Sequence, residues 1–182
     1  MTVDVSALVE RVATYTPRAR PDCWAATALI LTDTPAGPEV LLIRRVTRDG
    51  DRWSGDMALP GGKADPGDLS VAATAAREAL EETQVQVSAA VGRLDDIEGR
   101  PLTHRVATVV FTAEGRPEPI PEPLEVAEAV WLPVAALADP ANRTWHRYGG
   151  VVPFPAITVG EYMIWGLTHR ILTHFLAIAG LT

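Results

Sequence analysis

Apolar residues recur along this chain in two rhythms, one typical of helices and the other typical of strands. Val5, Leu8 and Val12 stand at helical spacing and predict a short amphipathic helix over residues 3–14. Runs rich in β-branched and apolar residues predict strands over residues 23–32, 39–46, 57–59, 85–94, 105–112 and 125–133. Two further apolar helices are predicted at residues 134–138 and 161–179, and residues 142–155 are expected to be irregular.

The run from Ser70 to Leu80 predicts a central helix, because it is rich in alanine and contains no Gly or Pro. Asp68 or Ser70 is expected to cap its first turn, and the β-branched residues at 83–85 are expected to end it. Strands before and after this helix, with helices at both ends of the chain, imply an α/β fold with a central mixed sheet between helices. We expect one domain over residues 1–182, with its core at about 23–137.

Composition excludes several classes of protein. The net charge of −7 argues against nucleic acid as a partner. A single cysteine, Cys23, rules out an internal disulfide framework, and the start of the chain lacks a basic and apolar leader, so a cytoplasmic location is expected. The most apolar tract, residues 162–181, contains His169, Arg170 and His174, which argues against a membrane span.

Three carboxylates crowd the last turns of the central helix. Glu78, Glu81 and Glu82 are three and four residues apart, so they share one side of the helix and repel one another. Their place at the carboxyl end of the helix makes this less favourable still, because the helix dipole disfavours anions there. A cation should therefore lie among them, either Arg77 or a hard divalent ion such as Mg²⁺ or Mn²⁺. The alternative is a solvated acidic face.

The stretch Leu59-Pro60-Gly61-Gly62-Lys63 and the following Arg77-Glu78-Ala79-Leu80-Glu81-Glu82 resemble the Nudix box, the signature of hydrolases that act on a nucleoside diphosphate linked to another group. The chain departs from the box at two positions. Asp68 stands in place of Glu, with eight residues instead of seven before the arginine, and Gln84 stands in place of Gly. This insertion, and the tract from Tyr162 to Leu172, resemble the coenzyme A pyrophosphatase branch of the family.

The resemblance implies a Nudix-type α/β/α sandwich and a metal-dependent hydrolysis of a diphosphate bridge. It places Glu78 and Glu82 as the main metal ligands, with Glu81 as a further ligand or as the holder of a metal-bound water. Arg77 is expected to orient a neighbouring Glu through a bidentate pair. The general base stays open between Glu81 and Glu125, with His104 as a third candidate.

Basic residues concentrate just before the box, where they are suited to phosphate groups. Together with the flexible glycine loop they form the expected substrate site: Arg44, Arg45, Arg52, Gly61, Gly62 and Lys63. Ile43 and Val46 replace the hydroxyl residues that the coenzyme A branch carries beside Arg45. Coenzyme A or acyl-coenzyme A is the first expectation for the substrate, and another nucleotide is the alternative.

Two further alternatives stay open at this point. The chain could be a Nudix-like module that binds a nucleotide without turnover, or a structural acidic helix in an unrelated fold. The apolar residues Trp165, Leu167, Ile171 and Phe175 of the last predicted helix would suit a homodimer contact, and burial within one subunit would account for them equally well.

Overall fold

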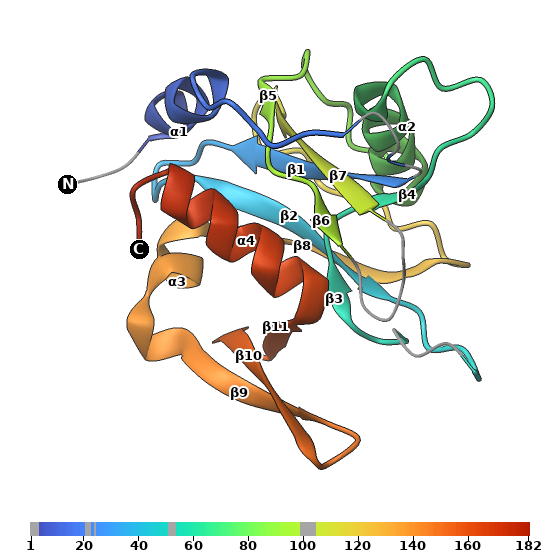
Figure 1. Ribbon diagram of the computed structural model, residues 1–182, viewed down its shortest axis with the longest axis vertical. Coiled ribbons are helices and arrows are strands. Elements are labelled where there is room, and N and C mark those ends of the chain that lie inside the picture. The colour runs from blue at the N-terminus through green and yellow to red at the C-terminus, as the bar shows by residue number, and fades with distance from the viewer. Residues whose placement is uncertain (1–3, 21–22, 24, 51–53, 99–104) are drawn as a thin grey trace.

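The computed structural model describes residues 4–20, 23, 25–50, 54–98 and 105–182. Helices alternate with strands along this part of the chain (Figure 1). The helices are α1 (Val5–Ala13), α2 (Val71–Thr83), α3 (Val134–Ala138), the 3-10 turn η1 (Pro140–Asn142) and α4 (Gly166–Ile178). The strands are β1 (Ala25–Thr32), β2 (Glu39–Arg45), β3 (Met57–Ala58), β4 (Gly61–Lys63), β5 (Gly92–Arg93), β6 (Ile97–Glu98), β7 (Arg105–Thr112), β8 (Val126–Pro133), β9 (Arg143–Tyr148), β10 (Val152–Val159) and β11 (Tyr162–Trp165).

The described strands form a mixed sheet of eight strands and a second sheet of three. In the large sheet, β1 pairs in parallel with β7 and antiparallel with β2 and β4. Strand β2 also pairs antiparallel with β3 and β8. The first two strands therefore form a hairpin, and the predicted mixed character of the sheet is confirmed.

Each face of the large sheet has its own hydrophobic core. On one face, Ala75 and Ala79 of α2 pack against alternate residues of β1 such as Ile30. On the other face, α1 and α4 contribute Leu8 and Phe175, both fully buried. Figure 1 shows α2 and α4 with the strands between them. The predicted sandwich of a central sheet between helices is confirmed.

Helix α2 begins and ends where its sequence indicates. The side chain of Ser70 accepts a hydrogen bond from the Ala73 amide at 3.1 Å, so Ser70 and not Asp68 is the cap. At the other end Gln84 adopts a left-handed conformation with φ of 58°, and its amide donates to the Leu80 carbonyl at 2.9 Å. A left-handed residue commonly closes a helix, and glycine is the residue that accepts it without strain.

Two predicted elements are wrong. The strand expected at 85–94 is reduced to Gly92–Arg93, because the preceding residues meet β7 only through separate hydrogen bonds such as Ser88 N to Thr112 O at 2.8 Å. The irregular stretch at 142–155 is instead the β9–β10 hairpin. Pro153 and Pro155 fit into β10 because β11 begins to pair only at residue 156, so their missing N–H groups interrupt no ladder.

The last helix begins later than expected. Residues 162–165 form β11, and Gly166 has φ of 63°, a conformation that turns the chain from strand into helix. Ile171 and Phe175 of α4 are 1% and 0% exposed inside the chain, so they offer no surface to a second subunit. No helix in the described ranges is long and apolar enough to cross a membrane.

Candidate active site

The glycine loop lies directly against α2. Gly61 N donates a hydrogen bond to Oε2 of Glu82 at 2.9 Å, and the Glu82 residue is only 4% exposed. A Cβ at Gly61 would lie 2.5 Å from the Ala26 carbonyl oxygen, so β4 can approach β1 only without a side chain there. A Cβ at Gly62 would lie 2.5 Å from Oε1 of Glu78. The two glycines therefore let carboxylates of the helix rest on the loop backbone.

Arg77 joins the loop to the helix. Its Nε and Nη2 donate to the two carboxylate oxygens of Asp68 at 3.2 and 2.9 Å. Its Nη1 donates to Glu78 at 3.1 Å and to Glu81 at 2.9 Å, and Nη2 also reaches the Lys63 carbonyl at 3.0 Å. The bidentate partner is thus Asp68 and not a neighbouring Glu, which corrects the expectation, while both neighbouring Glu residues receive one bond each.

This network changes the acid strength of its members. Hydrogen bonds from Arg77 hold the pKa of Asp68 far below its usual range, and the same pairing raises the pKa of the guanidinium. Asp68 is therefore a permanent anion that fixes Arg77. The extra residue between Asp68 and Arg77, relative to the Nudix box, therefore does not prevent an acidic side chain from pairing with the arginine.

Glu82 is the most perturbed carboxylate of the site. Burial raises its pKa to about 8, and the charges of Glu78 and Glu125 push it in the same direction, while the Gly61 amide and Arg45 oppose them. Burial likewise raises the pKa of Glu78. Glu125, in the turn just before β8, therefore acts on the charges of both Glu78 and Glu82, which lie in the last turns of α2.

The donor set suits a hard divalent cation. Oxygen ligands that are partly buried and mutually repelling are stabilised by a cation such as Mg²⁺ or Mn²⁺. Within the described residues, however, no three His, Cys, Asp or Glu side chains are gathered closely enough to form a finished site. The reason lies in the hydrogen bonds: Glu78 and Glu81 point to Arg77, and Glu82 points to the Gly61 amide.

The two arginines at the end of β2 lie on opposite faces of the sheet. Arg45 acts on the charge of Glu82, so it belongs to the α2 face. Arg44 pairs with Glu128 at 3.4 Å and Glu161 at 3.5 Å, and its guanidinium lies 5.2 Å from the centre of the Tyr162 ring. The two residues were predicted to act together, yet the alternation of side chains along a strand separates them.

Arg44 lines an open cavity of about 240 Å³ on the face away from α2. Other walls come from Asp56, whose carboxylate accepts the Trp165 indole N–H at 2.9 Å, and from His146, whose ring is centred 4.4 Å from that of Trp165. This cavity could not be predicted from the sequence, because the β9–β10 hairpin that supplies His146 was not expected. Lys63, the last residue of β4, is exposed, whereas Arg52 and His104 lie outside the described residues.

Comparison with known proteins agrees with this geometry. The NUDIX domain model matches residues 23–151. The mitochondrial coenzyme A diphosphatase NUDT8 of Homo sapiens is 34% identical over 175 residues, which cover 90% of this chain and 71% of that protein. An uncharacterized protein of Schizosaccharomyces pombe, C14C4.10c, is 39% identical over 119 residues, which cover 59% of this chain and 35% of that protein.

The chain thus spans about a third of the yeast relative and nearly three quarters of the human one. Among solved structures, a MutT/nudix family protein from Enterococcus faecalis superposes with a TM-score of 0.56 over 98% of this chain and 70% of that one, at 18% identity, which supports the fold alone. On the domain match and the human relative, this chain belongs to the Nudix hydrolase family.

Proposed function

We propose that this chain hydrolyses the diphosphate bridge of a nucleoside diphosphate derivative, with coenzyme A or an acyl-coenzyme A as its substrate. The observation that carries the reaction is the placement of Glu82, buried against the Gly61 amide with Glu78 and Glu125 close enough to raise its pKa. A protein that only bound nucleotides would have no need to bury mutually repelling carboxylates. Perturbed acids of this kind concentrate at catalytic sites.

Glu78 and Glu82 would hold Mg²⁺ or Mn²⁺, with Glu81 as the third donor. The ion would supply neutralisation of the phosphoryl oxygens and a lowered pKa for a bound water. Arg77 keeps Glu78 and Glu81 oriented from the side, because its guanidinium is anchored on Asp68. Glu78 already rests against Gly62, so the backbone of the loop limits where its carboxylate can lie.

Glu125 is our choice for the group that accepts the proton of the attacking water. It is exposed to solvent, it acts on the charges of both Glu78 and Glu82, and its backbone is fixed by the bond from Val46 N to its carbonyl at 3.0 Å. Glu81, the other candidate, already accepts a hydrogen bond from Arg77 at 2.9 Å. That bond already engages one oxygen of the Glu81 carboxylate with Arg77, and Glu81 is also the third metal donor proposed above.

The choice of coenzyme A is supported by the human relative, which is named as a coenzyme A diphosphatase. Arg45 lies on the face of Glu82 and is suited to a phosphate of the substrate. The cavity beside Arg44 lies on the opposite face of β2 from Arg45, and its aromatic and acidic walls are suited to another part of the substrate. Ile43 and Val46 stand where the coenzyme A pyrophosphatase branch carries hydroxyl residues. Other nucleotides are therefore tested alongside coenzyme A.

The test is a product-mass screen with Mg²⁺ and with Mn²⁺ over coenzyme A, acetyl-coenzyme A, nucleotide sugars, dinucleotides and nucleoside triphosphates. Cleavage of coenzyme A to phosphopantetheine and adenosine 3′,5′-bisphosphate is expected. Glu82→Gln should lower kcat by about 100-fold or more, since it removes a metal-ligating charge. Glu10→Gln, on the exposed face of α1, is the matched control and should leave kcat unchanged.

Arg45→Ala should raise KM for the preferred substrate with a smaller change in kcat, because it removes a contact that precedes the chemistry. Metal-dependent cleavage of a different diphosphate would keep the reaction and replace the substrate. Absence of turnover on every compound, with nucleotide binding retained, would refute the hydrolase and leave a binding module. A cytoplasmic location stays a prediction from the single cysteine.

A further inference from the structure

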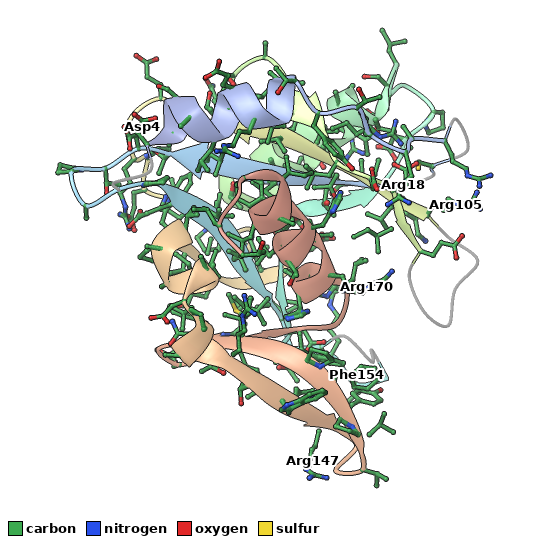
Figure 2. All side chains as sticks on the ribbon, turned by 60° about the vertical axis from the view of Figure 1, so that its left-hand side comes forward. Asp4, Arg18, Arg105, Arg147, Phe154 and Arg170 are labelled. Atoms are coloured by element: carbon green, nitrogen blue, oxygen red, sulfur yellow. The ribbon has the colours of Figure 1, made fainter. Side chains whose placement is uncertain are left out.

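The second sheet forms an arm that extends away from the eight-stranded sheet. Strands β9, β10 and β11 follow one another in the order β11-β10-β9, so β9 is the outer edge. In Figure 1 the β9–β10 hairpin projects below the rest of the molecule, and in Figure 2 Arg147 lies near its far end. The arm therefore offers surface that the main body does not cover.

One face of the arm carries alternating basic and aromatic side chains. Arg143, Trp145 and Arg147 are two residues apart on β9, so they point to the same side. All three are exposed, and Trp145 has 65% of its surface in solvent. Pro155 stands opposite Trp145 in the register and Pro153 stands opposite Arg147, which extends the same face. We call Arg143, Trp145 and Arg147 the arm face.

The other side of the arm is already occupied. The rings of His146, Tyr148 and Phe154 lie 4.4, 5.4 and 5.6 Å from the Trp165 ring, which is itself buried. These aromatic residues are therefore accounted for by packing within the chain. Trp145 is on the opposite side and, within the part of the chain that the structure describes, makes no ring contact of this kind, so its exposure calls for a different explanation.

The charge of the arm is opposite to that of the chain. Residues 140–160 contain no Asp or Glu, although the whole chain has a net charge of −7. Among the described residues, neither Arg143 nor Arg147 forms an ion pair. Trp and Arg are also the residues most enriched where binding energy concentrates in protein interfaces. The arm face thus suits an acidic surface with apolar residues in it.

This chain itself carries such a surface. In Glu118-Pro119-Ile120-Pro121-Glu122-Pro123-Leu124, every second residue is proline and the others alternate between acidic and apolar. Ile120 is 64% exposed and Leu124 is 73% exposed. The Ile120 amide donates to Thr83 O at 2.8 Å and the Glu122 amide to Glu82 O at 2.9 Å, which fixes the backbone on the end of α2. We call residues 118–124 the acidic segment.

The two surfaces match in sequence pattern as well as in charge. Arg143, Trp145 and Arg147 repeat every two residues in the order basic, aromatic, basic, and Glu118, Ile120 and Glu122 repeat every two residues in the order acidic, apolar, acidic. On β9 the repeat corresponds to about 6.6 Å, whereas residues 118–122 lie outside the strands and residues 123–124 are in a turn. An apolar residue at the centre with opposite charges on both sides is the arrangement expected of a specific contact.

We propose that two copies of this chain associate by placing the arm face of each on the acidic segment of the other. Two such contacts related by a twofold axis close into a dimer, whereas a single contact of this kind would continue into a chain of molecules. The buried residues of α4 play no part in this contact, which distinguishes it from the dimer surface that the sequence suggested. The proposal does not depend on hydrolase activity.

The test is the mass of the full-length protein by light scattering after size-exclusion chromatography, over a dilution series. The wild type is expected to be a dimer that dissociates on dilution. Trp145→Ala should weaken the dimer by about 30-fold, as is typical for truncating a central interface Trp. Leu69→Ala, which removes a side chain from a residue that is 97% exposed at a distant place in the sequence, is the matched control and should leave the mass unchanged.

A charge exchange tests the pairing of the two surfaces directly. The variant Arg143→Glu with Arg147→Glu and the variant Glu118→Arg with Glu122→Arg should each be monomeric, because like charges then face each other. Mixed together they should form a heterodimer, because both contacts become complementary again. Circular dichroism of each variant confirms that it is folded.

A wild type that stays monomeric at high concentration would overturn the proposal. So would a dimer that survives Trp145→Ala, or two charge variants that fail to associate when mixed.

Discussion

Gly62→Ala separates the geometry of the candidate site from the stability of the fold. Gly62 does not have the positive φ that favours glycine, so alanine can adopt its backbone conformation. The three atoms nearest to the new methyl group would all belong to the carboxylate group of Glu78, at 2.5 Å for Oε1, 2.6 Å for Cδ and 2.7 Å for Oε2. These atoms are the end of a flexible side chain, so the carboxylate can move while the fold is kept.

The size of that movement sets the expected effect. Ordinary contact with a Cβ begins at about 3.4 Å, so the nearest oxygen, now 2.5 Å away, must shift by roughly 0.9 Å. A displacement of about 1 Å in a positioning group can cost about 100-fold in rate. We therefore expect kcat of Gly62→Ala to fall by about 100-fold with Mg²⁺ as the metal, while the melting temperature changes by only a few degrees.

Two other glycines of the same loop provide the controls. Gly67→Ala adds a methyl group with nothing within 4 Å and should leave both kcat and the melting temperature unchanged. Gly61→Ala directs the methyl group at the backbone of β1, 2.5 Å from the Ala26 oxygen and 2.7 Å from Thr27 Cα, and should prevent folding. Wild-type kcat in Gly62→Ala would refute the assignment of Glu78 as a metal ligand held by this loop.

Two further predictions concern stability. Gln84→Gly should raise the free energy of unfolding by about 1 kcal/mol in a urea titration, because Gln84 is held at φ of 58° and glycine accepts that conformation without strain. A lower urea midpoint for the variant would show that the Gln84 side chain is needed. Asp95→Asn should cost about 2 kcal/mol at neutral pH, since Asp95 accepts the Tyr15 hydroxyl and the Arg18 amide, both at 2.8 Å. Burial alone would raise the pKa of Asp95, but these bonds and the Arg18 guanidinium lower it overall. The stabilisation is therefore present above the unfolded pKa of about 4 and disappears as the pH falls through the native value, so the two proteins should converge in acid; a difference that stays constant with pH would refute this account.

The parts of the fold that the sequence predicted are those in which a local pattern decides the structure. Helix α2 is alanine-rich and has Ser70 before it, so propensity and capping agree on where it begins. Strands β1, β2 and β7 are continuous apolar runs with a helix covering each face of their sheet. Where several local preferences point the same way, tertiary contacts have little left to change.

The wrong predictions concern elements that depend on distant partners. Residues 143–159 contain Gly149, Gly150 and two prolines, which argue for an irregular segment, yet the two glycines form the turn between β9 and β10. Pairing with β11 then stabilises the hairpin, and β11 was hidden in an apolar tract that resembles a helix. A short strand of four residues cannot be distinguished from a buried helix by its periodicity alone.

In the candidate site too, the features set by local sequence were predicted and the contacts between distant residues were not. The carboxylates of α2 were predicted from their spacing, since positions three and four apart on a helix must lie together. The pairing of Arg77 with Asp68 was not predicted, because Asp68 lies in a loop whose path cannot be deduced from residue spacing. Arg44 and Arg45 were grouped because they are adjacent in sequence, although adjacent residues of a strand point to opposite faces.

Small buried residues on α2 and on β1 allow the helix to approach the sheet closely. Ala75 and Ala79 are fully buried on the helix, and Ala26 and Ala28 are 1% and 0% exposed on the strand beneath it. Larger side chains in either row would lift the helix away from β1 and from β4, which pairs with β1. The Glu82 carboxylate can accept the Gly61 N–H at 2.9 Å only because the helix lies this close to the sheet. The buried alanines therefore determine the geometry of the candidate site as directly as its glycines do.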